Sequence, residues 1–173
     1  NGKEDANDDN NSMSKEIRTF IKSIARTTMI EHFSSSTCQP CVEVDNTMTT
    51  LTEDNKDKFT YVKYPWNYPG VGDKYYIEDC SVRGAYYGVS GVPSIIFDGT
   101  TTTKQPKQSY FDNSYAIPAY IKIIGGYEIE GSNITVKATI TPYIDITDVK
   151  LFMTVNEKTT TGNVGTNGLT EFH

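Results

Sequence analysis

Residues 27–41 read TTMIEHFSSSTCQPC, and this stretch decides the fold. Its first seven residues are rich in β-forming side chains and run into three serines, which predicts a buried strand that enters a loop. A Cys-x-x-Cys motif, Cys38 to Cys41, follows at once. From Cys41 to Leu51 the apolar residues recur at spacings of three and four, so the motif is expected to open a helix with one buried face.

Further strands and helices alternate on both sides of this stretch. Residues 59–64 and 91–99 have the composition of strands, and the second of these closes on a glycine turn. Residues 14–25 carry apolar side chains at helical spacing, and 75–87 also favour a helix. This alternation predicts an α/β fold in which helices cover a mixed sheet.

The period of the pattern changes to two after Pro118. Residues 121–129, 134–140 and 149–155 alternate between apolar and polar side chains, which predicts three half-buried strands, with a hairpin turn at 131–133. This pattern is typical of an antiparallel, immunoglobulin-like β-sandwich, which needs about seven strands in about 100 residues.

The expected organisation is therefore an α/β domain at 14–117 and a β-sandwich at 118–173. Because 118–173 is too short for seven strands, and because the chain stops inside a strand-like run at 169–173, we expect the sandwich to be partial. Residues 1–13 are polar and acidic, which predicts a disordered tail. The absence of an initiator Met and of a signal peptide suggests a mature or trimmed chain.

Composition excludes several classes of function. The formal net charge is −6 and the pI is near 4.9, so the chain lacks the basic surface that nucleic-acid binding requires. No run of 18 apolar residues is present, so we expect membrane association only through a lipid anchor ahead of Asn1. Two histidines beside the cysteines make a structural zinc site, which needs four ligands, a weak alternative. We expect neither a metal nor a cofactor.

The Cys-x-x-Cys motif predicts thiol chemistry. A helix N-terminus directs unpaired N–H groups and the positive end of its dipole at the first sulfur, which favours the nucleophilic thiolate. Cys38, at the turn, is expected to be exposed, whereas Cys41 lies one turn inside the helix and is shielded. Thiol–disulfide exchange needs this combination, with Cys38 forming the mixed disulfide and Cys41 resolving it.

Three segments together resemble the thioredoxin fold: IEHF at 30–33, CQPC at 38–41 and GVPS at 91–94. The resemblance implies that the Val92–Pro93 bond is cis and that the backbone of Val92 pairs with a bound peptide. The run YYGVSGVP at 86–93, the strand pattern at 134–155 and the run GLTEFH at 168–173 resemble more closely the Omp28-related outer-membrane proteins of Bacteroidetes, which join a thioredoxin-like domain to a β-sandwich. This likeness implies an extracytoplasmic, cell-envelope location, a possible lipoprotein, and protein thiols or disulfides or an envelope redox protein as partners.

Two positions depart from the thioredoxin pattern. Thr37, a candidate substrate-binding residue, stands where thioredoxins have a tryptophan beside the first cysteine, which puts their usual substrate docking in doubt. His32 stands where they bury an acid that aids proton transfer to the second cysteine. His32 is thus a candidate proton relay, and the alternative is a structural strand histidine.

The main alternative is a non-catalytic binding or adhesion module, in which a structural Cys38–Cys41 disulfide staples the first helical turn. Disulfides of both kinds persist outside the cytoplasm, so the sequence leaves both readings open. Cys80 remains as a lone third cysteine, and we interpret it as a partly buried helix residue beside Asp79.

Overall fold

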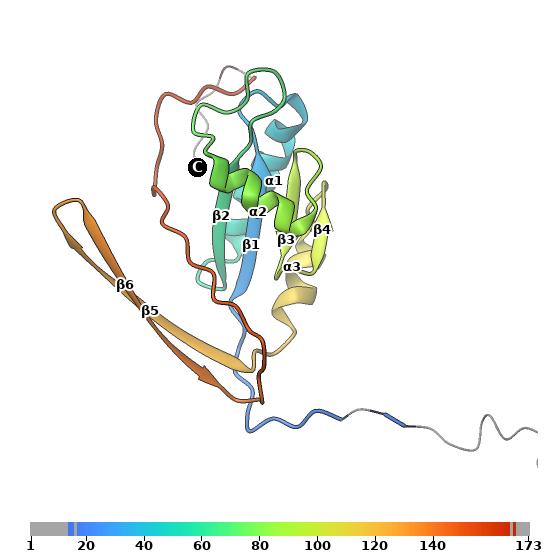
Figure 1. Cartoon of the computed structure of the whole chain (residues 1–173). Helices are drawn as coiled ribbons and strands as arrows, with labels where there is room; N and C mark the ends of the chain where they lie inside the picture. The colour runs from blue at the N-terminus through green and yellow to red at the C-terminus, as the bar shows by residue number, and fades with distance from the viewer. Residues whose placement is uncertain (1–13, 16, 167, 169–173) are drawn as a thin grey trace, which may run out of the picture. The chain divides into compact units, whose positions relative to one another are not determined.

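Figure 1 shows the chain as a computed structural model, which describes residues 14, 15, 17–166 and 168. The predicted tail at 1–13 and the strand-like run at 169–173 lie outside the described residues. Clustering of contacts gives two compact units. The described residues up to Ile24 join Tyr120–Val149 in one unit, and Ala25–Ala119 joins the described residues from Lys150 onward in the other. Within the described part of the chain, no helix combines the length and apolarity needed to cross a membrane.

The larger unit contains a four-stranded mixed sheet. Its strands are β1 (Thr28–Ser34), β2 (Phe59–Pro65), β3 (Ser94–Phe97) and β4 (Thr101–Thr103), in the spatial order β2-β1-β3-β4. Strand β1 pairs parallel with β2 and antiparallel with β3, and β3 pairs antiparallel with β4. The sequence predicted β1, β2 and β3 from their β-forming composition, and these predictions are confirmed.

Three helices accompany this sheet: α1 (Gln39–Asp54), α2 (Glu78–Tyr87) and α3 (Gln108–Tyr115). Helix α1 buries the apolar positions whose spacing predicted it. Helix α2 ends at Gly88, whose left-handed φ of 67° is favourable for glycine and closes the helix with backbone hydrogen bonds. The mixed α/β architecture predicted from the sequence is confirmed.

The helices cover both faces of the sheet, and Figure 1 shows α2 in front of the strands. On one face, Ile30 and Ile95 pack in one cluster with residues of α1 and with Phe111 of α3. On the other face, Phe33 and Ile96 pack with Cys80 of α2. Because neighbouring residues of a strand point to opposite faces, each central strand contributes side chains to both clusters.

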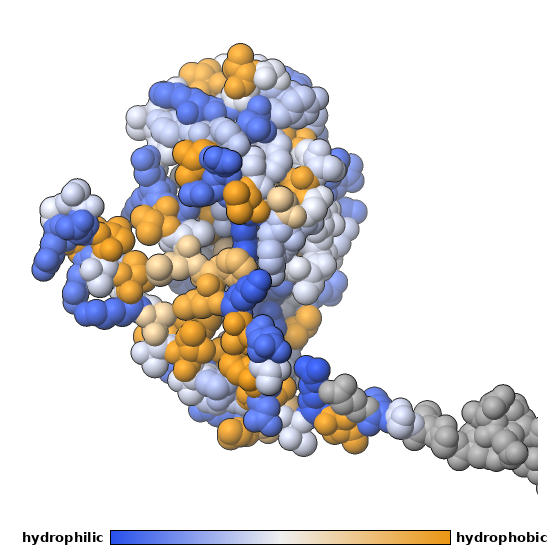
Figure 2. Space-filling view, in the orientation of Figure 1, coloured by the Kyte–Doolittle hydropathy of each residue, from blue (hydrophilic) through white to orange (hydrophobic). Residues whose placement is uncertain are grey.

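The smaller unit contains a two-stranded antiparallel ribbon, β5 (Ile121–Glu130) and β6 (Asn133–Pro142). Its register places apolar residues opposite one another on one face, as in the pairs Ile123↔Ile140 and Tyr127↔Val136. Both strands and the turn between them were predicted. Their half-burial was not correctly predicted, because Tyr127 is 71% exposed; Figure 2 shows apolar side chains along the surface of the ribbon.

Two predicted elements are wrong. The described residues of 14–25 form no helix: Phe20 makes an isolated bridge with Ile144, and Ile21 is 85% exposed. A helix of this length is marginal without a surface that buries its apolar face. Residues 149–155 form no strand, although their pattern has period two, so two of the three strands predicted after Pro118 are present.

Candidate active site around the Cys38–Cys41 disulfide

The two cysteines of the motif lie where the central strand passes into the first helix. Strand β1 ends at Ser34, a short loop follows, and Cys38 caps α1 with extended backbone angles. Pro40 lies in the first helical turn, where its lack of an N–H costs nothing. Cys38 and Cys41 are joined by a disulfide, with Cα atoms 5.3 Å apart.

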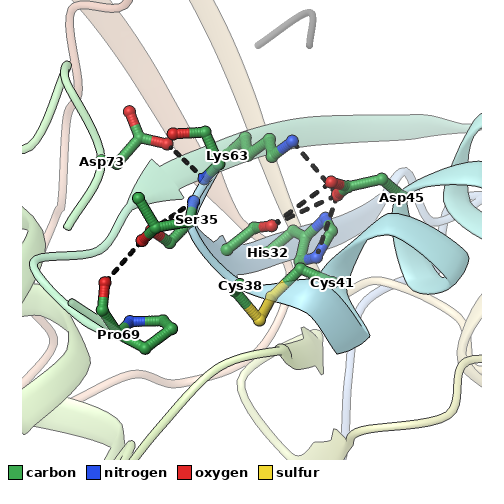
Figure 3. The surroundings of a disulfide bond; sticks show 11 residues. His32, Ser35, Cys38, Cys41, Asp45, Lys63, Pro69 and Asp73 are labelled. Carbon is green, nitrogen blue, oxygen red and sulfur yellow. Dashed lines mark hydrogen bonds and ion pairs between the residues drawn. A yellow bond between two sulfur atoms is a disulfide. The ribbon is translucent and has the colours of Figure 1, made fainter. Parts of the chain in front are cut away.

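The exposure predicted for Cys38 is wrong. Cys38 is 2% exposed and Cys41 is fully buried. The preceding residue, Thr37, donates a hydrogen bond from its hydroxyl to the carbonyl of Pro69, with an O–O distance of 2.6 Å. In Figure 3, Pro69 lies beside the disulfide, so the loop after β2 approaches the motif from outside α1.

A buried polar cluster lies behind the disulfide. His32 is fully buried, and Figure 3 shows its ring between the disulfide and the carboxylate of Asp45. The distance from His32 Nε2 to Asp45 Oδ1 is 3.6 Å, and Nδ1 shares a hydrogen bond of 2.7 Å with the Tyr61 hydroxyl. The ammonium of Lys63 lies 3.1 Å from Asp45 Oδ1. Asp45 thus links the imidazole to a buried cation.

The register of the strands explains this cluster. His32 and Lys63 are direct partners across the β1–β2 pair, and Tyr61 lies on the same face of β2 as Lys63. Asp45 is four residues beyond Cys41, so both side chains project from one face of α1. The sequence analysis singled out His32 and missed its three partners, although the i, i+4 spacing from Cys41 to Asp45 was a usable signal.

Burial changes the proton affinities in this cluster. Burial raises the pKa of Asp45 above its ordinary value, and the charge of Lys63 opposes that rise. Burial also raises the pKa of Tyr61, and the neighbouring charge of Asp45 adds to the shift. Tyr61 therefore stays a neutral phenol at physiological pH. Burial therefore opposes the charged form of Asp45.

A cavity of about 90 Å³ adjoins the cluster, lined by Asp45, Met48, Thr49, Thr52, Tyr61 and Lys63. Ligand pockets usually have volumes of about 300–1,000 Å³, so this cavity is too small for a typical small-molecule substrate. Its polar lining suits a few water molecules. The cavity therefore favours exchange of protons with water at Asp45 over binding of a ligand.

The candidate substrate-binding residues lie at the same end of the sheet as the motif. Ser94, the first residue of β3, pairs with Phe33 next to the end of β1, so Val92 and Pro93 approach the loop that leads to Cys38. The Val92–Pro93 bond is cis, as the resemblance implied. Val92 is half-buried and Pro93 is buried.

A second buried polar cluster lies on the opposite face of β1. The carboxylate of Glu31 accepts hydrogen bonds from Arg83 Nε at 2.7 Å and Arg83 Nη2 at 3.1 Å. It also accepts hydrogen bonds from the hydroxyls of Tyr64 and Tyr87. Glu31 is 1% exposed, and all of these donors satisfy its carboxylate. This cluster therefore has a structural role and connects β1 to α2.

Cys80 is a free thiol on α2 and is 5% exposed. Burial raises the pKa of this thiol, and the negative charges of Asp79 and Asp73 add to the shift. It is therefore a protonated, shielded thiol at neutral pH, which fits its interpretation as a packing residue. Within the described residues, no group of three or more His, Cys, Asp or Glu side chains is placed to hold a metal ion.

Comparison with known proteins gives no family. No family model and no curated protein matches the chain. One similar solved structure is the crystal structure of an Agrobacterium tumefaciens protein determined by a structural genomics consortium. The two chains are 18% identical with a TM-score of 0.49, and the match covers 65% of this chain. It spans 56% of the other protein, little more than half of its length.

Proposed function

We propose that this protein is a thiol–disulfide exchange protein of a bacterial cell envelope. Cys38 exchanges with thiols or disulfides of partner proteins, and Cys41 resolves the mixed disulfide. The observation that carries the proposal is the disulfide-bonded Cys-x-x-Cys at the N-terminus of α1, directly after a central strand. A closed disulfide also favours an extracytoplasmic location, because cytosolic thiols are kept reduced.

The proposed scaffold is thioredoxin-like. The order of elements in the larger unit supports it, with β1-α1-β2 forming a parallel crossover and β3-β4-α3 following as a hairpin and helix. The cis Val92–Pro93 bond at the motif's end of the sheet is a further point of likeness. In this proposal the half-buried backbone of Val92, together with Thr37, contacts the partner peptide.

The reaction follows the chemistry of disulfides. A partner thiolate attacks the Cys38 sulfur, the Cys38–Cys41 bond breaks, and its electron pair leaves on the Cys41 sulfur as a thiolate. A second partner thiolate then attacks the partner's own sulfur in the mixed disulfide and releases the Cys38 thiolate. The partner is oxidised by two electrons and this protein is reduced by two. The reverse sequence reduces a partner disulfide.

His32 is proposed to serve the Cys41 sulfur in this reaction. When the disulfide opens, the buried Cys41 thiolate requires a proton, since an isolated charge is costly in the interior. His32 lies on that side of the disulfide and is linked to Asp45, which in turn lines the cavity. Proton exchange between Cys41 and water through His32 and Asp45 is the role that this arrangement supports.

One observation favours the second candidate, a binding module with a structural disulfide. Cys38 is 2% exposed, and a cysteine in so buried a residue position reacts slowly with an external thiol. A structural disulfide has a reduction potential below about −300 mV, whereas exchange proteins lie above that value. The potential of the Cys38–Cys41 pair therefore separates the two functions.

The experiment compares the full chain with three single variants in dithiothreitol-driven reduction of insulin. Cys80→Ser is the matched control and keeps the wild-type rate, because its thiol is buried and protonated. Cys38→Ser loses the activity, and Cys41→Ser traps a mixed disulfide with insulin. The proposal fails if wild type and Cys38→Ser have the same rate, or if the potential of the pair lies below about −300 mV.

A further inference from the structure

Two segments distant in sequence meet at the loop that precedes Cys38. The first is the loop 66–76, which follows β2. The backbone N–H of Trp66 donates to the carbonyl of Ser34 at 2.8 Å, and the carbonyl of Pro69 accepts the hydroxyl of Thr37. Loop 66–76 is therefore attached to the residues before Cys38 at two points, and Figure 3 shows Pro69 next to Cys38.

Asp73 provides a third attachment. Its side chain is buried, with the residue 6% exposed, and Oδ2 accepts the backbone N–H of Ser36 at 2.8 Å. The other oxygen, Oδ1, accepts the N–H of Tyr75 at 2.9 Å, which fixes the carboxylate within its own loop. A carboxylate that accepts backbone N–H groups forms strong, charge-assisted hydrogen bonds.

The second segment, residues 160–163, lies on the outer side of the same loop. The side-chain amide of Asn163 donates to both oxygens of Asp73 at 3.4 Å, and Asn163 is 2% exposed. The hydroxyl of Tyr75 donates to the carbonyl of Thr161 and accepts its N–H. Asp73 thus links residues 160–163 to the backbone that leads to Cys38.

We infer that Asp73 is a positioning residue that controls access to the Cys38–Cys41 disulfide. Loop 66–76 and residues 160–163 form a cover, which Asp73 holds closed by binding Ser36 and Asn163 together. Opening of the Asn163–Asp73 contact lets the outer segment move away and admits a partner protein. This inference rests on the proposed exchange function, and it explains how Cys38, a residue that is 2% exposed, reaches a macromolecular partner.

The test measures the rate at which two reductants open the disulfide in the folded protein. One is dithiothreitol and the other is reduced thioredoxin, which needs a much larger opening. The full chain carries Cys80→Ser in every case, so that Cys38 and Cys41 are the reporting thiols. Asn163→Ala removes the outer contact of the cover. Asn156→Ala is the matched control, since Asn156 is exposed and donates locally to Thr154 at 2.9 Å.

We expect Asn163→Ala to raise the rate with reduced thioredoxin about tenfold, which is the effect of losing one hydrogen bond to a charged group. The rate with dithiothreitol rises by a smaller factor, and Asn156→Ala changes neither rate. Equal increases with both reductants indicate general loosening and overturn the inference. Unchanged rates overturn it as well.

Tyr75→Phe keeps the test decisive if Asn163→Ala fails to fold. This substitution removes the hydroxyl that contacts Thr161 and preserves the ring. We expect it to raise the rate with reduced thioredoxin more than the rate with dithiothreitol, as for Asn163→Ala. Failure of the proposed function has a different signature, in which neither reductant opens the disulfide of the folded wild type. In that case the cover has no exchange reaction to control.

Discussion

The sheet of the larger unit and the β5–β6 ribbon both direct neighbouring side chains to opposite faces, but they differ in burial. Ile95 and Ile96 of β3 are fully buried on opposite faces of the sheet. In the ribbon, Ile123 is 58% exposed and Ile129 is 61% exposed, although the register gathers them on one apolar face. The alternation of side chains along a strand therefore determines which of them share a face. How much that face contributes to the stability of the fold depends on whether another element packs on it.

The same difference separates the polar groups. The sheet buries Glu31 and His32 side by side, and their opposite orientations place each in its own network of partners. In the ribbon, charged side chains such as the pair Lys137–Glu128 are exposed to solvent. The buried polar groups of the larger unit need their hydrogen-bond partners for stability, whereas the charged groups of the ribbon are solvated by water.

Phe33→Ala is expected to cause the largest loss of stability among the substitutions that test this difference in burial. Phe33 is fully buried, stacks on Tyr64 with ring centroids 4.8 Å apart, and contacts Trp66 edge-on. Its truncation is expected to lower the free energy of unfolding by about 3–5 kcal/mol, because a cavity remains in the core. Urea unfolding followed by the fluorescence of Trp66, the single tryptophan, measures this loss.

Tyr127→Ala is the matched truncation in the ribbon. Tyr127 is 71% exposed, so the same assay is expected to show a change within about 0.5 kcal/mol. A loss of several kcal/mol at Tyr127 would mean that the apolar face of the ribbon is covered in solution. That result would break the comparison.

Arg83→Met tests the next largest difference. Arg83 holds the buried Glu31 carboxylate through two hydrogen bonds and is itself 16% exposed. Removal of one partner leaves a buried charge, and we expect a loss of about 3 kcal/mol in the free energy of unfolding. The hydroxyls of Tyr64 and Tyr87 still reach Glu31, which keeps the loss at the lower end of the usual range.

Lys137→Met removes the corresponding cation from the ribbon. The Lys137 and Glu128 side chains are 73% and 70% exposed, with the charged atoms 3.6 Å apart. Pairs of this kind contribute about 0–1 kcal/mol, so the urea midpoint is expected to stay within error of the wild type. If Lys137→Met were as destabilising as Arg83→Met, the ion pairs of the two units would be equivalent.

The elements that sequence reasoning located are those whose pattern coincides with a covered face. Helix α1 was predicted from its apolar spacing and strands β1 and β2 from their β-forming composition, and each of them packs in a buried cluster. Residues 14–25 and 149–155 carry equally regular patterns, yet the described residues of both segments form neither helix nor strand. Periodicity reports which face a segment would bury, and it carries no information on whether another element is available to cover it.

The candidate site divides in the same way. Cys38 and Cys41 lie in a short local motif that the sequence located directly, and the resemblance to the thioredoxin fold placed Pro93 opposite them. The residue before Cys38, Thr37, is hydrogen-bonded to Pro69, which follows in the chain after a whole helix and strand. Contacts of this range follow from the tertiary fold, and a local pattern does not contain them. Asp45 falls between the two cases, because its i, i+4 spacing from Cys41 indicates a shared helix face, whereas its proximity to His32 follows only from the tertiary fold.

Gly84→Ala is the smallest effect that still separates the two regions. An added Cβ at Gly84 of α2 would clash with Cη2 of Trp66, whose ring packs against Phe33. Alanine gains about 1 kcal/mol in helix propensity, but displacement of the indole costs about 1–3 kcal/mol. We therefore expect a net loss of about 1 kcal/mol and a shift in the Trp66 emission.

The matched variant in the ribbon is Gly126→Ala in β5. No atom lies within 4 Å of an added Cβ at this position. Alanine restricts the unfolded chain more than glycine does, so the variant is expected to be neutral or slightly stabilising, with unchanged Trp66 emission. Equal stability of Gly84→Ala and wild type, with the same emission, would mean that Trp66 does not rest on Gly84. The indole would then not pack between α2 and Phe33. The hydrophobic core of the larger unit would end at Phe33, without including Trp66 of loop 66–76.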